Sequence, residues 1–247
     1  MKKQHQVILS LGSNLGNRLE NIVRCIDNLH KEIGTIIRVS KLYETPSWGF
    51  ESEKFYNCAV IINTHKSAHQ VLEECLLLEE ALGRVREEAE GYHARIIDID
   101  VITFDEEIIA SEKLQVPHPE MQNRLFVLLP MQDLHLDWRH PILQKYLHEL
   151  LVLSEDKSNC KVIQNLEIPI ARLKLDHFNY IAIEGNIGSG KTTLTNKLAE
   201  DCNAKSVLER FADNPFLPKF YEDQNRYAFP LEMSFLADRY QQISDDL

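Results

Sequence analysis

The sequence predicts an α+β sandwich, followed by the beginning of a second, α/β unit. The first observation is that strand-like runs alternate with helix-like spacing, in the order β-α-β-β-α-β, between residues 7 and 104. The second is that this order is typical of a ferredoxin-like sandwich, in which two helices cover one face of an antiparallel sheet. The third is a glycine-rich turn near residue 185, placed between an expected strand and an expected helix, where a new pattern begins.

The elements of the sandwich follow from local patterns. β-branched and other apolar residues form four strand-like runs, at 7–11, 35–39, 56–64 and 95–104. Apolar residues recur at helical spacing over 19–33 and 71–82, and a glycine follows each helix. Ser67 and Gln70 have the spacing of a capping box before the second helix.

The pattern after the sandwich predicts a domain boundary. Two more helices are expected at 121–129 and 142–153, and the apolar periodicity then weakens from residue 155. A strand expected at 180–183 leads into the glycine-rich turn. We therefore expect a first domain at residues 1–155, a linker at 156–177 and a second domain at 178–247.

The composition indicates a folded, acidic protein. With 44% hydrophobic and 26% charged residues, the 247-residue chain falls outside the disordered and fibrous classes. Its net charge of −11 disfavours a nucleic-acid or anionic-membrane surface, because like charges repel, so neither partner is expected. The first apolar run, 7–11, is too short to cross a membrane. Five scattered cysteines without a CxxC pair fit a reducing compartment, so the expected location is cytoplasmic.

Two aspartates on one expected strand form the first candidate site. Side chains alternate along a strand, so Asp98 and Asp100 project from the same face about 6–7 Å apart, while the isoleucine between them faces a core. Carboxylates at that spacing suit two Mg²⁺ ions, which lie about 3.5–4 Å apart in two-metal sites. The alternative is that both are solvated acids on an open sheet face.

Basic residues gather just before and after this strand, although the chain as a whole is acidic. Guanidinium groups bind phosphate oxygens bidentately and stabilise charge as a phosphoryl group moves. Taken singly, each is more simply a surface residue, but together with the aspartates they predict a polyphosphate site. The residues concerned are Arg84, Arg86, Arg95, His118 and Arg124.

Aromatic and amide side chains suggest a flat acceptor molecule. Aromatic rings can sandwich a planar heterocycle, and Asn57 carries both a donor and an acceptor that can read its edge. The alternative is that the phenylalanines among these residues belong to an ordinary core. The rings concerned are those of Trp48, Phe55, Tyr56 and Phe126.

Six motifs follow one another between residues 5 and 153. They are Gly12-Ser13-Asn14-Leu15-Gly16, Tyr43-x-Thr45-Pro46, Asn57-x-Ala59-Val60, Glu79-x-x-Leu82-Gly83-Arg84-x-Arg86, Arg95-x-Ile97-Asp98-Ile99-Asp100 and Pro117-His118-x-x-Met121-x-x-Arg124-x-Phe126. In this order they resemble the family of 6-hydroxymethyl-7,8-dihydropterin pyrophosphokinases. Six ordered blocks are far more specific than any single motif.

The resemblance implies an activity and a set of roles. The family transfers the β,γ-diphosphate of ATP to the hydroxymethyl group of a reduced pterin, with release of AMP, in folate synthesis. The implied small-molecule partners are the reduced pterin and ATP, and the implied cofactor is Mg²⁺, as two ions held by Asp98 and Asp100. Catalytic roles are implied for Arg84, Arg86, Arg95, Asp98, Asp100 and His118. ATP contacts are implied for Glu79, Arg84, Arg95, His118 and Arg124, and a pterin pocket for Thr45, Gly49, Phe55, Asn57 and Phe126.

The glycine-rich turn carries the P-loop pattern of a phosphate-binding site. Its backbone N–H groups and the start of the following helix can cradle phosphates, Lys191 can reach their terminal oxygens, and Thr192 can ligate Mg²⁺. The strand before it and the helix after it are the context that the pattern needs. The residues of the pattern are Gly185, Gly188, Gly190, Lys191 and Thr192.

This turn and the motifs after it resemble part of a deoxynucleoside kinase. The motifs are Leu208-Glu209-Arg210, Asn214-Pro215-Phe216, Phe220-Tyr221 and Phe235-Leu236-x-x-Arg239. The resemblance implies that Glu209 is the base at the sugar hydroxyl, that Tyr221 and Arg239 lie near the substrate, and that Glu232 stands where a base-reading Gln is frequent. Because one strand–helix unit cannot bury both faces of a parallel sheet, we expect this partial P-loop kinase domain to be poorly folded and inactive alone.

The favoured function is a Mg²⁺-dependent pterin diphosphokinase carried by the first domain. One alternative is deoxynucleoside phosphorylation in a longer parent chain. The other is a nucleotide-binding module without turnover. AMP release, ADP formation with a deoxynucleoside, and ATP binding without turnover distinguish the three.

Overall fold

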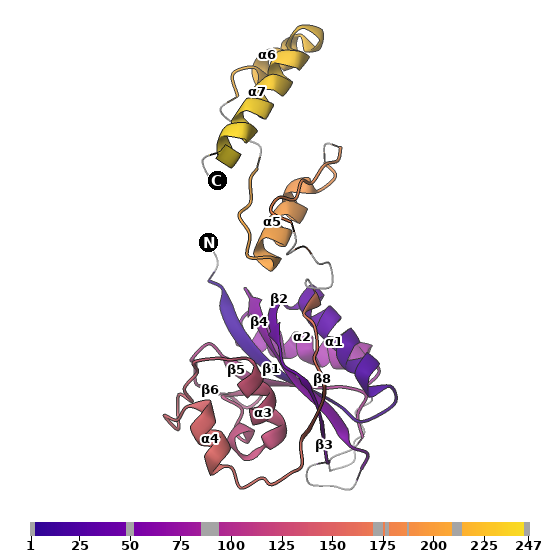
Figure 1. Ribbon diagram of the computed structural model, residues 1–247, viewed down its shortest axis with the longest axis vertical. Helices are drawn as coiled ribbons and strands as arrows, with labels where there is room; N and C mark the ends of the chain where they lie inside the picture. Colours follow the sequence, from indigo (N-terminus) through magenta and orange to yellow (C-terminus); the bar gives the residue numbers. More distant parts are fainter. Residues whose placement is uncertain are drawn as a thin grey trace. The chain divides into compact units, whose positions relative to one another are not determined.

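A computed structural model describes residues 3–47, 52–84, 94–169, 175, 178–186, 188–208 and 214–244. The chain divides into two compact units, residues 1–177 and 178–247 (Figure 1). The first unit contains both sheets found among the described residues. The regular structure of the second unit consists of helices over the residues described.

The first unit is built on a six-stranded antiparallel sheet. The central strand β1 (His5–Ser13) lies between β5 and β4, so both of its edges are paired. The strands run in space in the order β5 (Asp98–Phe104), β1, β4 (Phe55–Thr64), β3 (Leu42–Thr45) and β8 (Lys161–Gln164), and β2 (Thr35–Val39) also pairs with β4. The predicted α+β class with an antiparallel sheet is confirmed.

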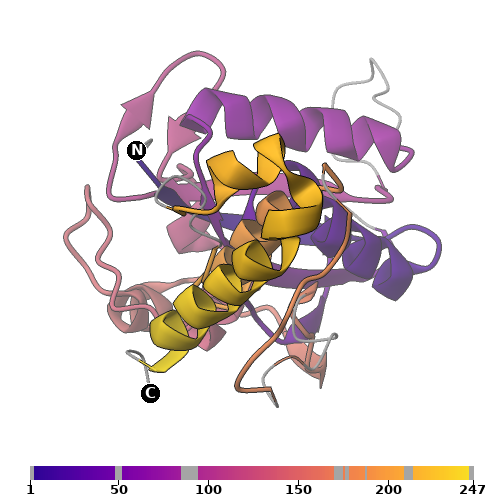
Figure 2. The ribbon, with the colours of Figure 1, turned by 90° about the horizontal axis from the view of Figure 1, so that it is seen from above.

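One face of the sheet is covered by α1 (Arg18–Glu32) and α2 (Ala68–Ala81) (Figures 1 and 2). Because side chains alternate along a strand, every second residue of β1 faces these helices: Val7, Leu9 and Leu11 are fully buried against them. The predicted capping box of Ser67 and Gln70 begins α2. The expectation that Ile99, between the two aspartates, faces a core is also confirmed, since it belongs to this cluster together with Ile97 and Val101.

The opposite face is covered in part by η1 (Met121–Asn123), α3 (Leu125–Asp133) and α4 (Leu147–Leu153). The side chain of Ile8 points to the opposite side of β1 from those of Val7 and Leu9, and it packs in this second core. The helix predicted at 121–129 is wrong in detail, because the extended backbone of Arg124 (φ −127°, ψ 104°) separates η1 from α3.

The helix predicted at 142–153 is shorter than expected. Gln144 has a left-handed backbone with φ 54°, and Tyr146 is extended with ψ 160°, so the helix begins only at Leu147. Three short strands were not predicted at all: β3, β6 (Ile109–Ala110) and β7 (Gln115–Val116). A fourth, β8, lies in the segment 156–178, where the apolar residues allow a short strand as well as a linker.

β8 lies within the segment predicted to be a linker. It pairs with β3 as an edge strand of the first unit's sheet. Leu166 and Ile168, which follow it, pack against the core beneath α1 and α2. Residues up to Ile168 are therefore attached to the first unit by both hydrogen bonds and apolar contacts.

The second unit has little core. Its helices are α5 (Lys191–Asp201), α6 (Leu217–Glu222) and α7 (Gln224–Ser244), and among its described residues only Asn214 and Leu231 are buried. The strand predicted at 180–183 is absent from the described segment 178–186, because a lone strand has no neighbour to complete its hydrogen bonds. No helix in the described ranges has the length and apolar character of a bilayer span.

Candidate active site

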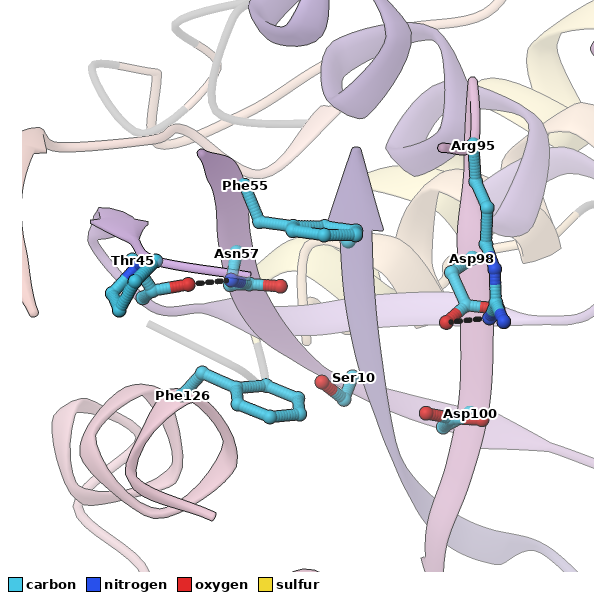
Figure 3. A pocket seen from close by; sticks show the side chains of 10 residues that line it. Ser10, Thr45, Phe55, Asn57, Arg95, Asp98, Asp100 and Phe126 are labelled. Atoms are coloured by element: carbon cyan, nitrogen blue, oxygen red, sulfur yellow. Dashed lines mark hydrogen bonds and ion pairs between the residues drawn. The ribbon is translucent and has the colours of Figure 1, made fainter. Parts of the chain in front are cut away.

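A pocket lies where the second half of β1 meets the first residues of β4 and β5, on the sheet face that carries α3 (Figure 3). It brings four of the five predicted pterin residues together with both predicted metal ligands and one of the predicted phosphate contacts, Arg95. It is lined by Ser10, Gly12, Thr45, Pro46, Phe55, Asn57, Arg95, Asp98, Asp100 and Phe126.

One half of the pocket is aromatic, with a buried amide. Asn57 is 4% exposed, and its Nδ2 donates a hydrogen bond of 2.7 Å to Thr45 Oγ1. Figure 3 shows the rings of Phe55 and Phe126 on either side of the opening next to Asn57. Gly12 makes room, since a Cβ there would lie 2.9 Å from Asn57 Oδ1. This half therefore offers a flat apolar slot with an amide at its edge.

The other half of the pocket combines carboxylates with guanidinium groups. Asp98 accepts a hydrogen bond from Arg84 Nη1 at 2.6 Å on one carboxylate oxygen, and one from Arg95 Nη1 at 2.7 Å on the other. Arg84 is thereby joined to the pocket although it does not line it. Two positive charges are therefore held beside the carboxylate of Asp98.

A buried carboxylate supports this half from below. Glu79 is 2% exposed, and its Oε1 accepts hydrogen bonds from Arg84 Nη1 and, at 2.8 Å, from the backbone N–H of Ile99. Ile99 is the residue between the two aspartates, so Glu79 fixes both the guanidinium group and the strand that carries the acids. Glu79, for which an ATP contact was predicted, therefore positions other residues of the site and does not itself line the pocket.

Asp100 has an unusual charge environment. Burial and the negative charge of Asp98 raise its pKa to about 7, against the lowering effect of the Arg124 charge. A divalent cation beside it would favour the ionised form and reverse this shift. Mg²⁺ prefers oxygen ligands. The two carboxylates of Asp98 and Asp100, one of which is costly to ionise, therefore form a donor set that fits this ion.

His118 and Arg124 contribute to the electrostatics around the pocket without lining it. The Nδ1 of His118 accepts a hydrogen bond of 3.1 Å from the N–H of Glu120, so the proton of the neutral ring sits on Nε2. Burial, followed by the charge of Arg124, lowers the pKa of His118, which keeps the ring neutral at pH 7. Arg124 itself is 9% exposed, and its guanidinium carbon lies 5.7 Å from the ring centre of Phe126.

Some site residues were missed, and others lie outside the described residues. Gly49 and Arg86 are in the latter group. Ser10, Gly12 and Pro46 line the pocket but had been given no role. Ser10 had a visible signal, because it is the polar residue that interrupts the apolar run of β1.

In the second unit, two glycines of the predicted phosphate loop have left-handed backbone conformations. Gly188 and Gly190 have φ values of +78° and +85°, which glycine adopts readily. The Nζ of Lys191 donates to the carbonyl oxygens of Gly185 at 2.7 Å and Asn186 at 3.0 Å. Thr192 is the second residue of α5, Tyr221 lies on α6, Glu232 and Arg239 lie on α7, and Glu209 lies outside the described residues.

The raised pKa of Asp100 predicts a pH-dependent stability. Between its ordinary value of 3.8 and about 7, the folded state keeps a proton that the unfolded chain has released, so the free energy of unfolding falls as pH rises. In metal-free buffer, Asp100→Asn should match wild type near pH 4 and have the higher Tm at pH 8, by about 2–4 °C for each kcal/mol of stability that wild type loses. Thermal melts of both, with the exposed acid variant Glu106→Gln as control, measure this; identical pH slopes for Asp100→Asn and wild type contradict it.

Comparison with known proteins identifies two families along the chain. The family model of 7,8-dihydro-6-hydroxymethylpterin-pyrophosphokinase (HPPK) matches residues 8–136, and that of deoxynucleoside kinase matches residues 181–246. The 2-amino-4-hydroxy-6-hydroxymethyldihydropteridine pyrophosphokinase of Porphyromonas gingivalis is 37% identical over 138 residues, which are 55% of this chain and 93% of that protein. The enzyme of the same name from Bacillus subtilis is 39% identical over 128 residues, 51% of this chain and 75% of that protein.

Larger proteins share the same segment. The folic acid synthesis protein FOL1 of Dictyostelium discoideum is 38% identical over 138 residues, 56% of this chain but only 20% of its own length. A crystal structure of HPPK-DHPS in complex with substrates superposes with a TM-score of 0.52 at 13% identity, over 67% of this chain and 47% of that one, which shows a common fold. With the family model matched across its sheet and pocket, the chain belongs to the HPPK family.

Proposed function

We propose that the first unit transfers diphosphate from ATP to the hydroxymethyl group of 6-hydroxymethyl-7,8-dihydropterin, giving AMP and the pterin diphosphate for folate synthesis. The observation that carries this proposal is one pocket in which an aromatic slot with an amide edge adjoins two carboxylates and two guanidinium groups. Relatives with 37–39% identity carry the name of this enzyme, and FOL1 is named for folic acid synthesis.

The aromatic half suits the pterin. A bicyclic ring between Phe55 and Phe126 would have both of its faces covered, one by each phenyl ring, so that apolar contact replaces water there. Asn57 is held by Thr45, so its orientation is fixed before the substrate arrives. A pre-oriented amide that reads the ring edge favours the pterin over a flat ring without donors and acceptors.

The acidic half suits Mg²⁺ with ATP. Asp98 and Asp100 would hold the metal, and we propose two ions from the spacing of the carboxylates on alternate residues of β5. When bound, Mg²⁺ neutralises phosphate charge and acidifies the substrate hydroxyl. The residues present are sufficient for that role, since the elevated pKa of Asp100 marks a carboxylate that gains from a nearby cation.

The basic residues would position the phosphates. Arg84 and Arg95 already point their Nη1 groups at Asp98, so an anionic phosphate beside it would find two donors in place. Neutral His118 would add the Nε2–H as a third donor. Phosphoryl transfer depends mainly on alignment and charge stabilisation, so no side chain need act as a strong base.

We further propose a ferredoxin-like arrangement for the first domain and a partial P-loop kinase for the second. The two helices on one face of the antiparallel sheet support the former. The two positive-φ glycines ahead of α5 support the latter. β8 and the packing of Ile168 favour a domain boundary after residue 168 rather than at 155.

The metal assignment predicts a loss of turnover when both acids are neutralised. Asp98→Asn with Asp100→Asn should lower kcat/KM for AMP release about a thousandfold, equivalent to about 4 kcal/mol of lost charge stabilisation. The measurement is AMP formation from ATP and the reduced pterin by the full chain, with circular dichroism to verify folding. The matched control is Glu106→Gln, which neutralises an exposed acid near the end of β5 and should retain wild-type turnover. Wild-type turnover in the double variant would contradict the metal assignment.

The aromatic slot predicts a selective effect on the pterin. Phe126→Leu keeps an apolar side chain but loses the ring face, so KM for the pterin should rise about tenfold, in line with about 1–3 kcal/mol for stacking on an aromatic ring. KM for ATP should stay within about twofold. Phe178→Leu, which replaces an exposed phenylalanine of the second unit, is the control. Equal increases in both KM values would argue against a pterin slot.

A second candidate function is deoxynucleoside phosphorylation, favoured by the family match at residues 181–246. Over its described residues the second unit contains helices and no strand, so we expect no ADP formation that depends on a deoxynucleoside. Lys191→Ala should leave AMP release unchanged. ADP formation by wild type that disappears in Lys191→Ala would establish the kinase as a second activity of this chain.

A further inference from the structure

Asn14 occupies the junction between the two halves of the pocket. It directly follows β1, whose residue Gly12 pairs with Asn57 on one side and with Asp98 on the other. Its side chain is polar, yet Asn14 is only 2% exposed. A buried amide in this position needs partners for all of its polar atoms.

On the phosphate side of the pocket, Asn14 forms two hydrogen bonds with the backbone of Arg95. Its own N–H donates to the Arg95 carbonyl oxygen at 3.0 Å, and its side-chain Oδ1 accepts from the Arg95 N–H at 2.6 Å. The guanidinium group of Arg95 then pairs with Asp98 at 2.7 Å. Asn14 therefore fixes the point from which this arginine reaches into the pocket.

On the aromatic side of the pocket, Asn14 forms hydrogen bonds with the segment that precedes β4. Its Nδ2 donates to Ser52 Oγ at 3.0 Å and more weakly to the Glu53 carbonyl oxygen at 3.4 Å. β4 begins at Phe55, two residues after Glu53. One side chain thus bonds both to the segment that places Phe55 and to the backbone of Arg95.

We propose that Asn14 is a positioning residue that couples the two halves, so that the pterin and Mg·ATP bind cooperatively. A ligand that orders one half improves the placement of the other through this shared amide, and the effect is reciprocal. This inference rests on the proposed function. The requirement is specific for an amide: aspartate keeps the acceptor for Arg95 but lacks the two N–H donors.

The chain offers a matched control, Asn21, in the first turn of α1. The Nδ2 of Asn21 donates to Ser13 Oγ at 3.2 Å and to the Leu15 carbonyl oxygen at 2.9 Å. Asn21 therefore stabilises the segment after β1 through an equivalent pair of bonds, but it is bonded neither to Arg95 nor to Ser52 in the described structure. Its removal reports what a merely structural amide contributes.

The test is a binding cycle with the full-length chain. The dissociation constant of 6-hydroxymethyl-7,8-dihydropterin is measured with and without Mg²⁺ and a non-hydrolysable ATP analogue, and the ratio is the coupling factor. Wild type should show a ratio of about ten or more. Asn14→Ala and Asn14→Asp should bring the ratio close to one and lower kcat more than they raise either KM. Asn21→Ala should retain the wild-type ratio within about twofold.

The outcomes separate this inference from the proposed function. Normal AMP release by wild type with no cooperativity, or an unchanged ratio in folded Asn14→Ala, would refute the coupling alone. An equal loss in Asn21→Ala would show that the role is merely structural. If Asn14→Ala does not fold, Ser52→Ala removes the pterin-side acceptor only, and it should still lower the ratio at least threefold; an unchanged ratio there also refutes the proposal. Absence of AMP release by wild type would refute the proposed function and this inference with it.

Discussion

The ion-pair network at the start of β5 holds the site together. Asp98 is the first residue of the strand, and its two carboxylate oxygens each accept a guanidinium N–H, from Arg84 and Arg95. Arg84 is in turn anchored by Glu79, a buried carboxylate at the end of α2 that also accepts the Ile99 N–H. A buried charge is costly unless it is paired, so this network constrains the end of α2, Arg84, Arg95 and the first residues of β5 together.

The alternation of side chains along the central strands separates the core from the chemistry. On β1, Leu9 and Leu11 are buried under α1 and α2, while the alternate residues Ser10 and Gly12 line the pocket. On β5, Ile99 faces the same core between two pocket carboxylates. Since the acids share a backbone with a close-packed core, their spacing is set by the sheet and not by the flexibility of a loop.

The acidic net charge of the protein does not conflict with an anionic co-substrate. A charge of −11 acts over the whole surface and is screened over about 10 Å, whereas Arg84 and Arg95 act at the pocket itself. They also compensate Asp98 before any cation is bound, while Asp100 keeps an elevated pKa. This arrangement supports the proposal that the site accepts a cation and a phosphate together.

The sequence by itself determined the local features: the two main helices, the capping box of α2, the shared face of Asp98 and Asp100, and the family motifs. These depend on periodicities of two and 3.6 residues, which a short window contains. The roles of the individual site residues remain predictions, and Gly49 and Arg86 lie outside the described residues.

The tertiary structure decided the contacts between distant segments. Asn14 meets Arg95 across 81 residues, and β8 pairs with β3 from within a predicted linker. Neither contact leaves a periodic signal, since a four-residue edge strand is too short and a single amide has no period. The strand expected at 180–183 did not form for the same reason: a strand exists only when its neighbours supply hydrogen bonds, and no local pattern encodes those neighbours.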